Sequence, residues 1–174
     1  MNAVWISSEL PNEVPTEFKS PIIDQIQSLN PSFENFVAKG ETSELIRYFT
    51  KNSNHFSKAS RAFTPDDIVY CKAHYLFIPA ENNDQKLIAS AQFLVNNYLK
   101  TYGYLPKILV LEGQGIVAVE DSMKSVLNML EVYSNILKIS FYSENFGGPQ
   151  FMTNAQIEFI DNWEVENYRR QMAK

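Results

Sequence analysis

The sequence predicts an α/β domain in which two buried strands are flanked by long helices. Two apolar runs, at 108–111 and 116–119, stand on either side of Gly113-Gln114-Gly115. Bounded apolar runs with β-branched residues are typical of buried strands, and the glycines allow a tight turn between them. Apolar residues recur at helical spacing before this pair, up to Tyr102, and after it, up to about Glu144. This mixed order of strands and helices favours a layered α/β fold.

Composition indicates one globular domain. The chain has 174 residues, 45% of them hydrophobic, which is enough for one packed core. The net charge of −5 argues against a nucleic-acid partner, and no apolar run is long enough to predict a membrane span. Segment 1–15 lacks the pattern of a signal peptide, and the single Cys71 fits a reducing compartment. We therefore expect a cytoplasmic protein that binds neither nucleic acid nor membrane.

The chain is expected to begin with an arm or linker. Pro11 and Pro15 leave little room for regular structure in segment 1–15, so the single domain is expected to span 16–174. The next segments are interpreted from their apolar spacing. They are a short helix in 16–29, a strand in 32–39 ended by Gly40, an amphipathic helix over 41–51 and a loop over 52–61.

Thr64-Pro65-Asp66-Asp67 predicts a turn, because Pro presets φ and Asp side chains bond nearby backbone N–H groups. Segment 68–79 is rich in strand formers and predicts two strands with a break near 72–74. Capping residues then predict three helices. They run from the cap residues 82–84 to Tyr102 with Gly103 as the stop, from Asp121 or Ser122 to about Glu144, and from a Thr153–Gln156 capping box through Tyr168, with a Glu166–Arg170 pair.

Side chains that could carry metal chemistry are scarce. The strong ligands are His55, His74 and Cys71, whereas a catalytic zinc site usually takes three protein ligands. Cys71 and His74 are three residues apart and would face opposite sides of one strand, so they converge only if the chain bends. Glu112 could act as an acid or base but has no identified partner. The residues therefore predict no catalytic group, no metal site and no cofactor.

Five residues are candidates for ligand binding: Asp67, Lys72, Gly113, Gln114 and Gly115. Lys72 and the backbone donors of the turn at 64–67 could bind an anion, or they could be an ordinary turn with one outward lysine. The Gly-Gln-Gly turn could hold a phosphate, although it enters a strand, whereas phosphate-binding turns usually enter a helix. The alternative is a purely structural turn.

Three segments together resemble a known family. Phe-Thr-Pro-Asp-Asp-Ile-Val-Tyr-Cys-Lys at 63–72 resembles a Thr-Pro-Asp-His motif followed by Val or Ile and a later Lys. Segment 106–119 resembles a Gly-X-Gly strand pair, and Asn-Trp-Glu-Val-Glu at 162–166 resembles a Tyr-Trp-X-Leu-Glu piece. These motifs are typical of bacterial bifunctional proteins that join a rhamnulose-1-phosphate aldolase region to a short-chain dehydrogenase. The likeness covers 33–174 and belongs to the aldolase region, of the class II aldolase/adducin type.

The resemblance implies a three-layer α/β/α sandwich around a mostly antiparallel sheet. Family aldolases hold a divalent metal with a His-X-His pair and a His in a turn that corresponds to Gly113-Gln114-Gly115, so Gln114 stands in place of a ligand. Asp67 likewise stands in place of the motif His, and no His-X-His occurs. We expect a degenerate active site in a structural, oligomerising or ligand-binding unit. Its partners would be a second copy or an aldolase subunit, and its ligand a phosphorylated sugar. The alternative is a metal-dependent sugar-phosphate aldehyde-lyase completed by another chain or a missing segment.

Overall fold

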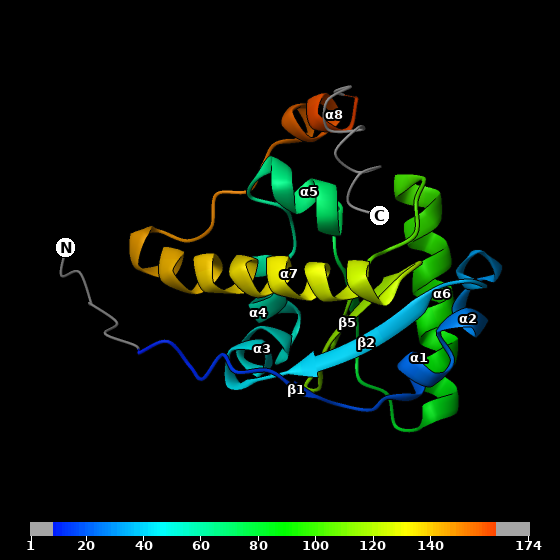
Figure 1. Cartoon of the computed structure of the whole chain (residues 1–174). Coiled ribbons are helices and arrows are strands. Elements are labelled where there is room, and N and C mark those ends of the chain that lie inside the picture. Colours follow the sequence, from blue (N-terminus) through cyan, green and yellow to red (C-terminus); the bar gives the residue numbers. More distant parts are fainter. Residues whose placement is uncertain (1–8, 163–174) are drawn as a thin grey trace.

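The computed structural model describes residues 9–162, and a five-stranded sheet forms its centre (Figure 1). The strand order is β1-β2-β5-β4-β3, and every neighbouring pair is antiparallel except β3 and β4, which are parallel. The predicted fold class is therefore confirmed as a mostly antiparallel sheet within an α/β structure. The strands are β1 Thr16–Glu17, β2 Val37–Thr42, β3 Leu76–Ile78, β4 Ile108–Leu111 and β5 Gly115–Glu120.

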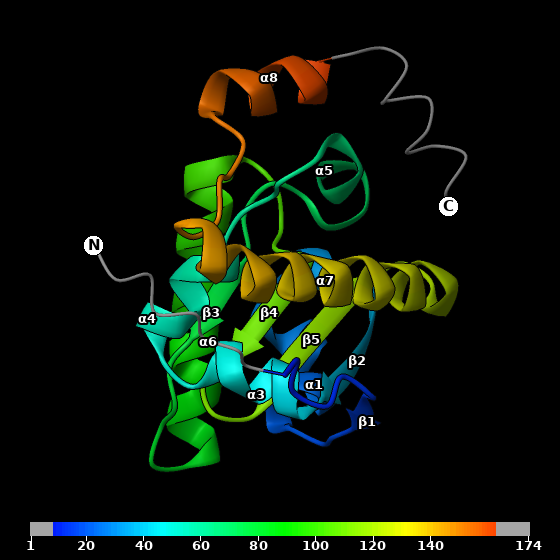
Figure 2. The ribbon, with the colours of Figure 1, turned by 90° about the vertical axis from the view of Figure 1, so that its left-hand side faces the viewer.

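Helices cover both faces of the sheet and complete three layers. One face packs against α1, α2 and α6, and the other against α3 and α7. Figure 2 shows α5 between α7 and α8, on the side of α7 away from α3. The helices are α1 Pro21–Asp24, α2 Ile26–Leu29, α3 Glu44–Thr50, α4 Ser53–Phe56, α5 Pro65–Cys71, α6 Asp84–Tyr102, α7 Met123–Ser143 and α8 Asn154–Asn162, with short 3₁₀ turns at η1 Pro31–Phe33, η2 Ser57–Ala59 and η3 Glu144–Phe146.

The central strand pair is buried on both faces, as the two apolar runs predict. Side chains alternate along a strand, so Leu109 and Leu111 join the core under α6, whereas Ile108 and Val110 join the core under α7. This two-sided burial explains why the runs are continuously apolar instead of alternating with polar residues.

The two long helices begin and end where their sequences predict. Asn83 and Ser122 cap α6 and α7 with their side chains, and Gly103 ends α6 in the left-handed conformation, with φ of 77°. The buried residues of α7 include a stripe of apolar residues that recur at helical spacing in the sequence: Val126, Leu130, Tyr133, Leu137 and Phe141.

The first strand predicted in 68–79 is wrong, because this segment begins as helix α5. Thr64 accepts from the backbone N–H of Asp67, and Asp67 accepts in return from the backbone of Thr64, which is a capping box. Pro65 at the first helical position adds to this start signal. Local capping therefore outweighs the strand propensity of the residues that follow, and only β3 remains a strand.

Three further boundaries differ from the prediction. Segment 16–29 holds β1 and two short helices instead of one helix, and 52–61 contains α4 and η2 where a loop was expected. Strand β2 continues through Gly40 to Thr42. A Cβ at position 40 would lie 2.5 Å from the Ile23 side chain and 2.7 Å from the Phe18 ring, so these side chains can approach the strand only because the residue is glycine. Gly40 thus permits close packing of α1 on the strand and does not end it.

The described chain begins with a segment that packs against two helices and ends with helix α8. Residues 9–15 contact α3 and α7, where the N–H of Leu45 donates to the carbonyl of Asn12, and Lys138 pairs with Glu13 at 2.8 Å. At the other end, Thr153 and Gln156 form the predicted capping interactions of α8. The continuation through Tyr168 and the Glu166–Arg170 pair lie outside the described residues. No helix within 9–162 combines the length and apolarity of a membrane span.

Candidate functional site

The Gly113-Gln114-Gly115 turn joins β4 to β5 and is fixed by contacts from neighbouring elements. Gly113 has φ of 70° and donates its N–H to the carbonyl of Thr50 at 2.7 Å. The carbonyl of Gln114 accepts from Oγ1 of Thr42 at 2.8 Å, and its side chain is half-buried. A Cβ on Gly115 would lie 2.6 Å from the carbonyl oxygen of Glu41. The main chain of this turn is therefore engaged with α3 and β2.

Glu112 lies beside the turn and has a structural contact of its own. Its carboxylate accepts from the backbone N–H of Ala80 at 2.9 Å, while its N–H donates to the carbonyl of Ile78. These bonds fix the loop that leaves β3 next to the end of β4. Glu112 therefore holds two loops together, as a carboxylate does when it accepts from backbone donors.

Asp67 and Lys72 lie at the opposite end of the strands from this turn. Both precede β3, and β3 runs parallel to β4, whose far end carries Gly113. Asp67 is only 6% exposed and accepts from the N–H groups of Phe63 and Thr64 at 2.8 and 2.9 Å. The structure thus does not bring the five candidate ligand-binding residues together into one cleft.

Lys72 ends α5 in a conformation unusual for a residue with a side chain. Its φ is 67°, and its ammonium group lies 4.8 Å from the centre of the Tyr104 ring. This geometry is a cation–π contact, which stabilises the lysine at the start of the segment leading into β3.

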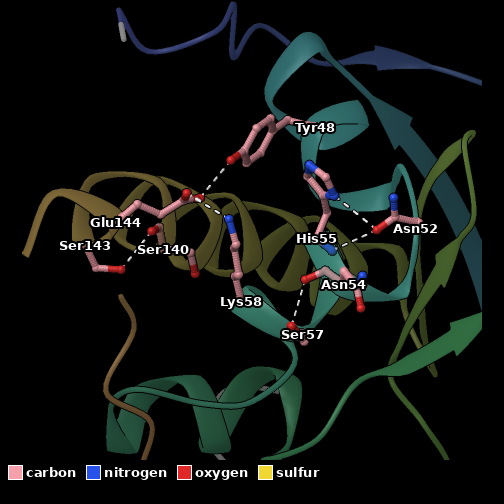
Figure 3. Close-up of polar contacts among 9 residues, drawn as sticks. All are labelled: Tyr48, Asn52, Asn54, His55, Ser57, Lys58, Ser140, Ser143 and Glu144. Carbon is pink, nitrogen blue, oxygen red and sulfur yellow. Dashed lines mark hydrogen bonds and ion pairs between the residues drawn. The ribbon is translucent and has the colours of Figure 1, made fainter. Parts of the chain in front are cut away.

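Polar side chains from α3, α4 and η2 gather near the end of α7, and those from α3 and η2 contact Glu144 there (Figure 3). Tyr48 and Lys58 both point toward Glu144 and donate to its carboxylate at 2.9 and 2.8 Å. Burial and the Glu144 carboxylate raise the pKa of Tyr48, and the hydrogen bond to Glu144 raises the pKa of Lys58. At neutral pH the phenol of Tyr48 is neutral and the amine of Lys58 is charged. The two contacts with Glu144 therefore hold α3 and η2 against the end of α7, and we call this group of three side chains the clamp.

The contacts of His55 show which of its two ring nitrogens carries the proton. Oδ1 of Asn52 accepts from the backbone N–H of His55, and it lies 3.0 Å from Nδ1 of the same residue. An acceptor at this place requires a proton on Nδ1, which leaves Nε2 as the ring nitrogen with a lone pair. Burial, helped by Lys58 and Lys51, lowers the pKa of His55. The imidazole is therefore neutral at neutral pH.

An open pocket of about 830 Å³ lies between the end of α6, α8 and the segments on either side of α5, which contribute Arg61 and His74. Its described lining includes Arg61, His74, Tyr102, Tyr104 and Asp161. The volume falls within the range of small-molecule sites. The pocket lies at the same end of the strands as Lys72, because His74 precedes β3 and Tyr104 precedes β4, and these two strands are parallel.

One wall of this pocket is aromatic. The His74 ring stacks on Tyr102 with centroids 4.2 Å apart, and Tyr98 contacts both Tyr102 and Tyr104. The hydroxyl of Tyr98 donates to the carbonyl of His74 at 2.8 Å, which fixes the histidine in place. Burial, followed by the charge of Arg61, lowers the pKa of His74, and burial raises the pKa of Tyr104. These rings are therefore uncharged at neutral pH.

Sequence reasoning missed both the clamp and the pocket. Glu144 lies 96 residues from Tyr48, so no local pattern connects them. The pocket had one local signal, since Tyr98 and Tyr102 are one helical turn apart and Tyr104 follows directly after Gly103. Such a run of tyrosines at a helix end predicts a shared aromatic surface.

Comparisons with solved structures show that the chain has the fold of the aldolase II superfamily. YgbL from Klebsiella pneumoniae, provisionally assigned as an aldolase, epimerase or decarboxylase, matches with a TM-score of 0.60 and 14% identity over 81% of this chain and 65% of its own. L-fuculose 1-phosphate aldolase matches with a TM-score of 0.56 and 13% identity, over 84% and 61%. An aldolase II superfamily protein from Pseudomonas syringae matches at 0.55 and 9%, over 87% and 59%.

These matches establish the fold alone. No protein-family model and no curated protein matches the sequence. The chain spans between 59% and 65% of the length of these three structures. The superfamily expected from the three motifs thus agrees with the fold that the structures share.

Proposed function

We propose that this chain is an aldolase-type domain without a complete metal site, which serves as a structural, oligomerising or ligand-binding unit. The β4–β5 turn carries the proposal. The residue that the family resemblance aligns with a metal-binding histidine is Gln114, whose carbonyl is bonded to Thr42, while Gly113 is bonded to Thr50. A closer relation to the aldolase region of the bifunctional rhamnulose-1-phosphate proteins, and a cytoplasmic location, belong to the same proposal.

The side chains near this turn do not fit a catalytic divalent metal. His55 follows α3, which contacts the turn, whereas His74 precedes β3 at the other end of the sheet. Cys71 is fully buried on α5, and burial raises the pKa of its thiol, which disfavours the thiolate that binds metals. Within residues 9–162, no three His, Cys, Asp or Glu side chains lie close enough together to hold an ion.

Exposed apolar side chains on α7 support a role in assembly. Met123, Leu127 and Ile139 are each 46% exposed, and Tyr142 is 50% exposed. Where exposed apolar side chains form one contiguous patch, they are a frequent feature of subunit contacts. The partner would be a second copy of this chain or an aldolase subunit.

The name of L-fuculose 1-phosphate aldolase supports a phosphorylated sugar as the ligand. Such a small molecule would use either Lys72 or the Gly113-Gln114-Gly115 turn, because they lie at opposite ends of β3 and β4.

Metal binding by the purified chain tests the proposal. We expect neither zinc nor manganese to bind stoichiometrically near neutral pH, measured by elemental analysis after dialysis and by titration calorimetry. Gln114→His is the matched variant, since it restores a nitrogen ligand at the turn while leaving the backbone unchanged. Stoichiometric zinc on the unmodified chain, lost in His55→Asn, would overturn the proposal.

A metal-dependent aldehyde-lyase completed by another chain or segment is the second candidate. Two observations favour it: the chain spans under two thirds of its structural neighbours, and Nε2 of His55 keeps a lone pair near α3. This candidate requires zinc to appear when a full-length aldolase subunit is added. Light scattering of the mixture, followed by metal analysis of the complex, separates it from metal-free assembly.

A further inference from the structure

The pocket beside α8 has opposite charges at its two ends. At the start of α8, Nη2 of Arg61 donates to Oδ1 of Asn154 at 2.7 Å. Farther along the helix, Glu158 and Asp161 line the same pocket. The helical rise places the Cα atoms of these two residues about 6 and 10 Å along the axis from that of Asn154. The positive and negative ends are therefore separated along the helix.

The negative end adjoins the aromatic wall. Burial is the main cause that raises the pKa of Tyr98 and of Tyr104, and the charge of Asp161 adds to it in both cases, so this carboxylate lies near enough to act on the tyrosines. Tyr102 is 39% exposed and presents its ring beside the same pocket. Aromatic faces and carboxylates both attract organic cations.

The uncharged histidine in the wall keeps this end favourable for a cation. His74 is neutral at neutral pH, because burial and Arg61 lower its pKa. The described charged groups that line the pocket are then Arg61 on one side, and Glu158 and Asp161 on the other.

We propose that this pocket binds a small zwitterion, with its ammonium group between the tyrosine wall and the carboxylates of Glu158 and Asp161, and its carboxylate at Arg61. The axial separation of about 6–10 Å selects an ω-amino carboxylate or a short peptide with free ends over an α-amino acid. The site lies at the end of the sheet opposite the Gly113 turn. It does not depend on whether the metal site is complete.

Three matched probes test this assignment by titration calorimetry at low ionic strength and pH 7. They are 6-aminohexanoate, hexanoate and hexylamine, which carry both charges, the negative charge alone and the positive charge alone. The zwitterion is expected to bind more tightly than either single-charge probe. Arg61→Gln should weaken the binding of 6-aminohexanoate by about tenfold, because one charge-assisted contact is lost, and should leave the affinity for hexylamine unchanged.

The reciprocal variant removes the negative end. The double variant Glu158→Gln and Asp161→Asn should bind hexylamine and 6-aminohexanoate more weakly, and its affinity for hexanoate should be unchanged. Arg61→Lys keeps the charge and should retain most of the affinity, which provides a readout if Arg61→Gln fails to fold. Glu131→Gln on α7 is the matched control outside this pocket. Absence of binding by all three probes, or equal binding of all three, would overturn the proposal, and neither result would bear on the zinc measurement.

Discussion

Replacing Asp67 separates a structural role from a ligand-binding role at the start of α5. Asp67 was a ligand-binding candidate by sequence, and the structure shows its carboxylate accepting from the backbone N–H groups of Phe63 and Thr64. Asp67→Ala would leave both donors without this acceptor and remove half of the capping box. We expect the free energy of unfolding to fall.

The size of the loss follows from the bonds that disappear. Each part-buried N–H left without its acceptor costs about 1 kcal/mol, so the two together cost about 2 kcal/mol. For a domain of this size the melting temperature should fall by about 4–8 °C. Asp67→Asn keeps one acceptor oxygen and should lose less than about 1 kcal/mol.

Urea denaturation followed by circular dichroism measures these changes. Asp84→Ala is the control, because Asp84 is an exposed acidic residue in the first turn of α6 and its loss should cost only about 0.5 kcal/mol through the helix dipole. If Asp67→Ala unfolded at the same urea concentration as the unmodified protein, the capping argument would be refuted. A ligand-binding role would then regain support.

Three further perturbations test other parts of the structure. Gly115→Ala should destabilise the protein by about 1–3 kcal/mol in urea denaturation, because its Cβ would meet the backbone carbonyl of β2 at 2.6 Å, and unchanged stability would contradict that packing. Glu144→Gln should make the amide hydrogens of η2 exchange faster, since Lys58 in η2 loses its charged partner, whereas a uniform exchange pattern would argue against a clamp. His55 and His74 both have a lowered pKa when folded, so the unfolded chain binds more protons below about pH 6.5, and stability should fall from pH 7 to 5.5; single His variants should flatten this slope.

Sequence reasoning succeeded where a long periodic signal decided the structure. The apolar stripe of α7 repeats from Val126 to Phe141, over about four turns, and each of its members is buried. The β4–β5 pair was predicted equally well, because two apolar runs around Gly113 and Gly115 admit few other arrangements. Packing at such positions follows directly from periodicity.

The failures come from short segments and long-range contacts. The strand-forming residues of segment 68–79 follow directly after a capping box formed by Thr64 and Asp67. The box decides the structure of the first part of this segment, because it satisfies the backbone donors of both residues and starts a helix. The pocket draws on segments around Arg61, Tyr102 and Asp161, which are far apart in sequence. No local pattern predicts that such residues meet.

The parallel pairing of β3 and β4 explains why the candidate residues separate into two groups. Residues that precede both strands gather at one end of the sheet, as Lys72, His74 and Tyr104 do. Residues that follow β4, as Gln114 does, lie at the other end. The turn aligned with the family's metal ligand and the aromatic pocket are therefore independent surfaces of one core. A substitution at one end of the sheet is therefore expected to leave the other end unchanged.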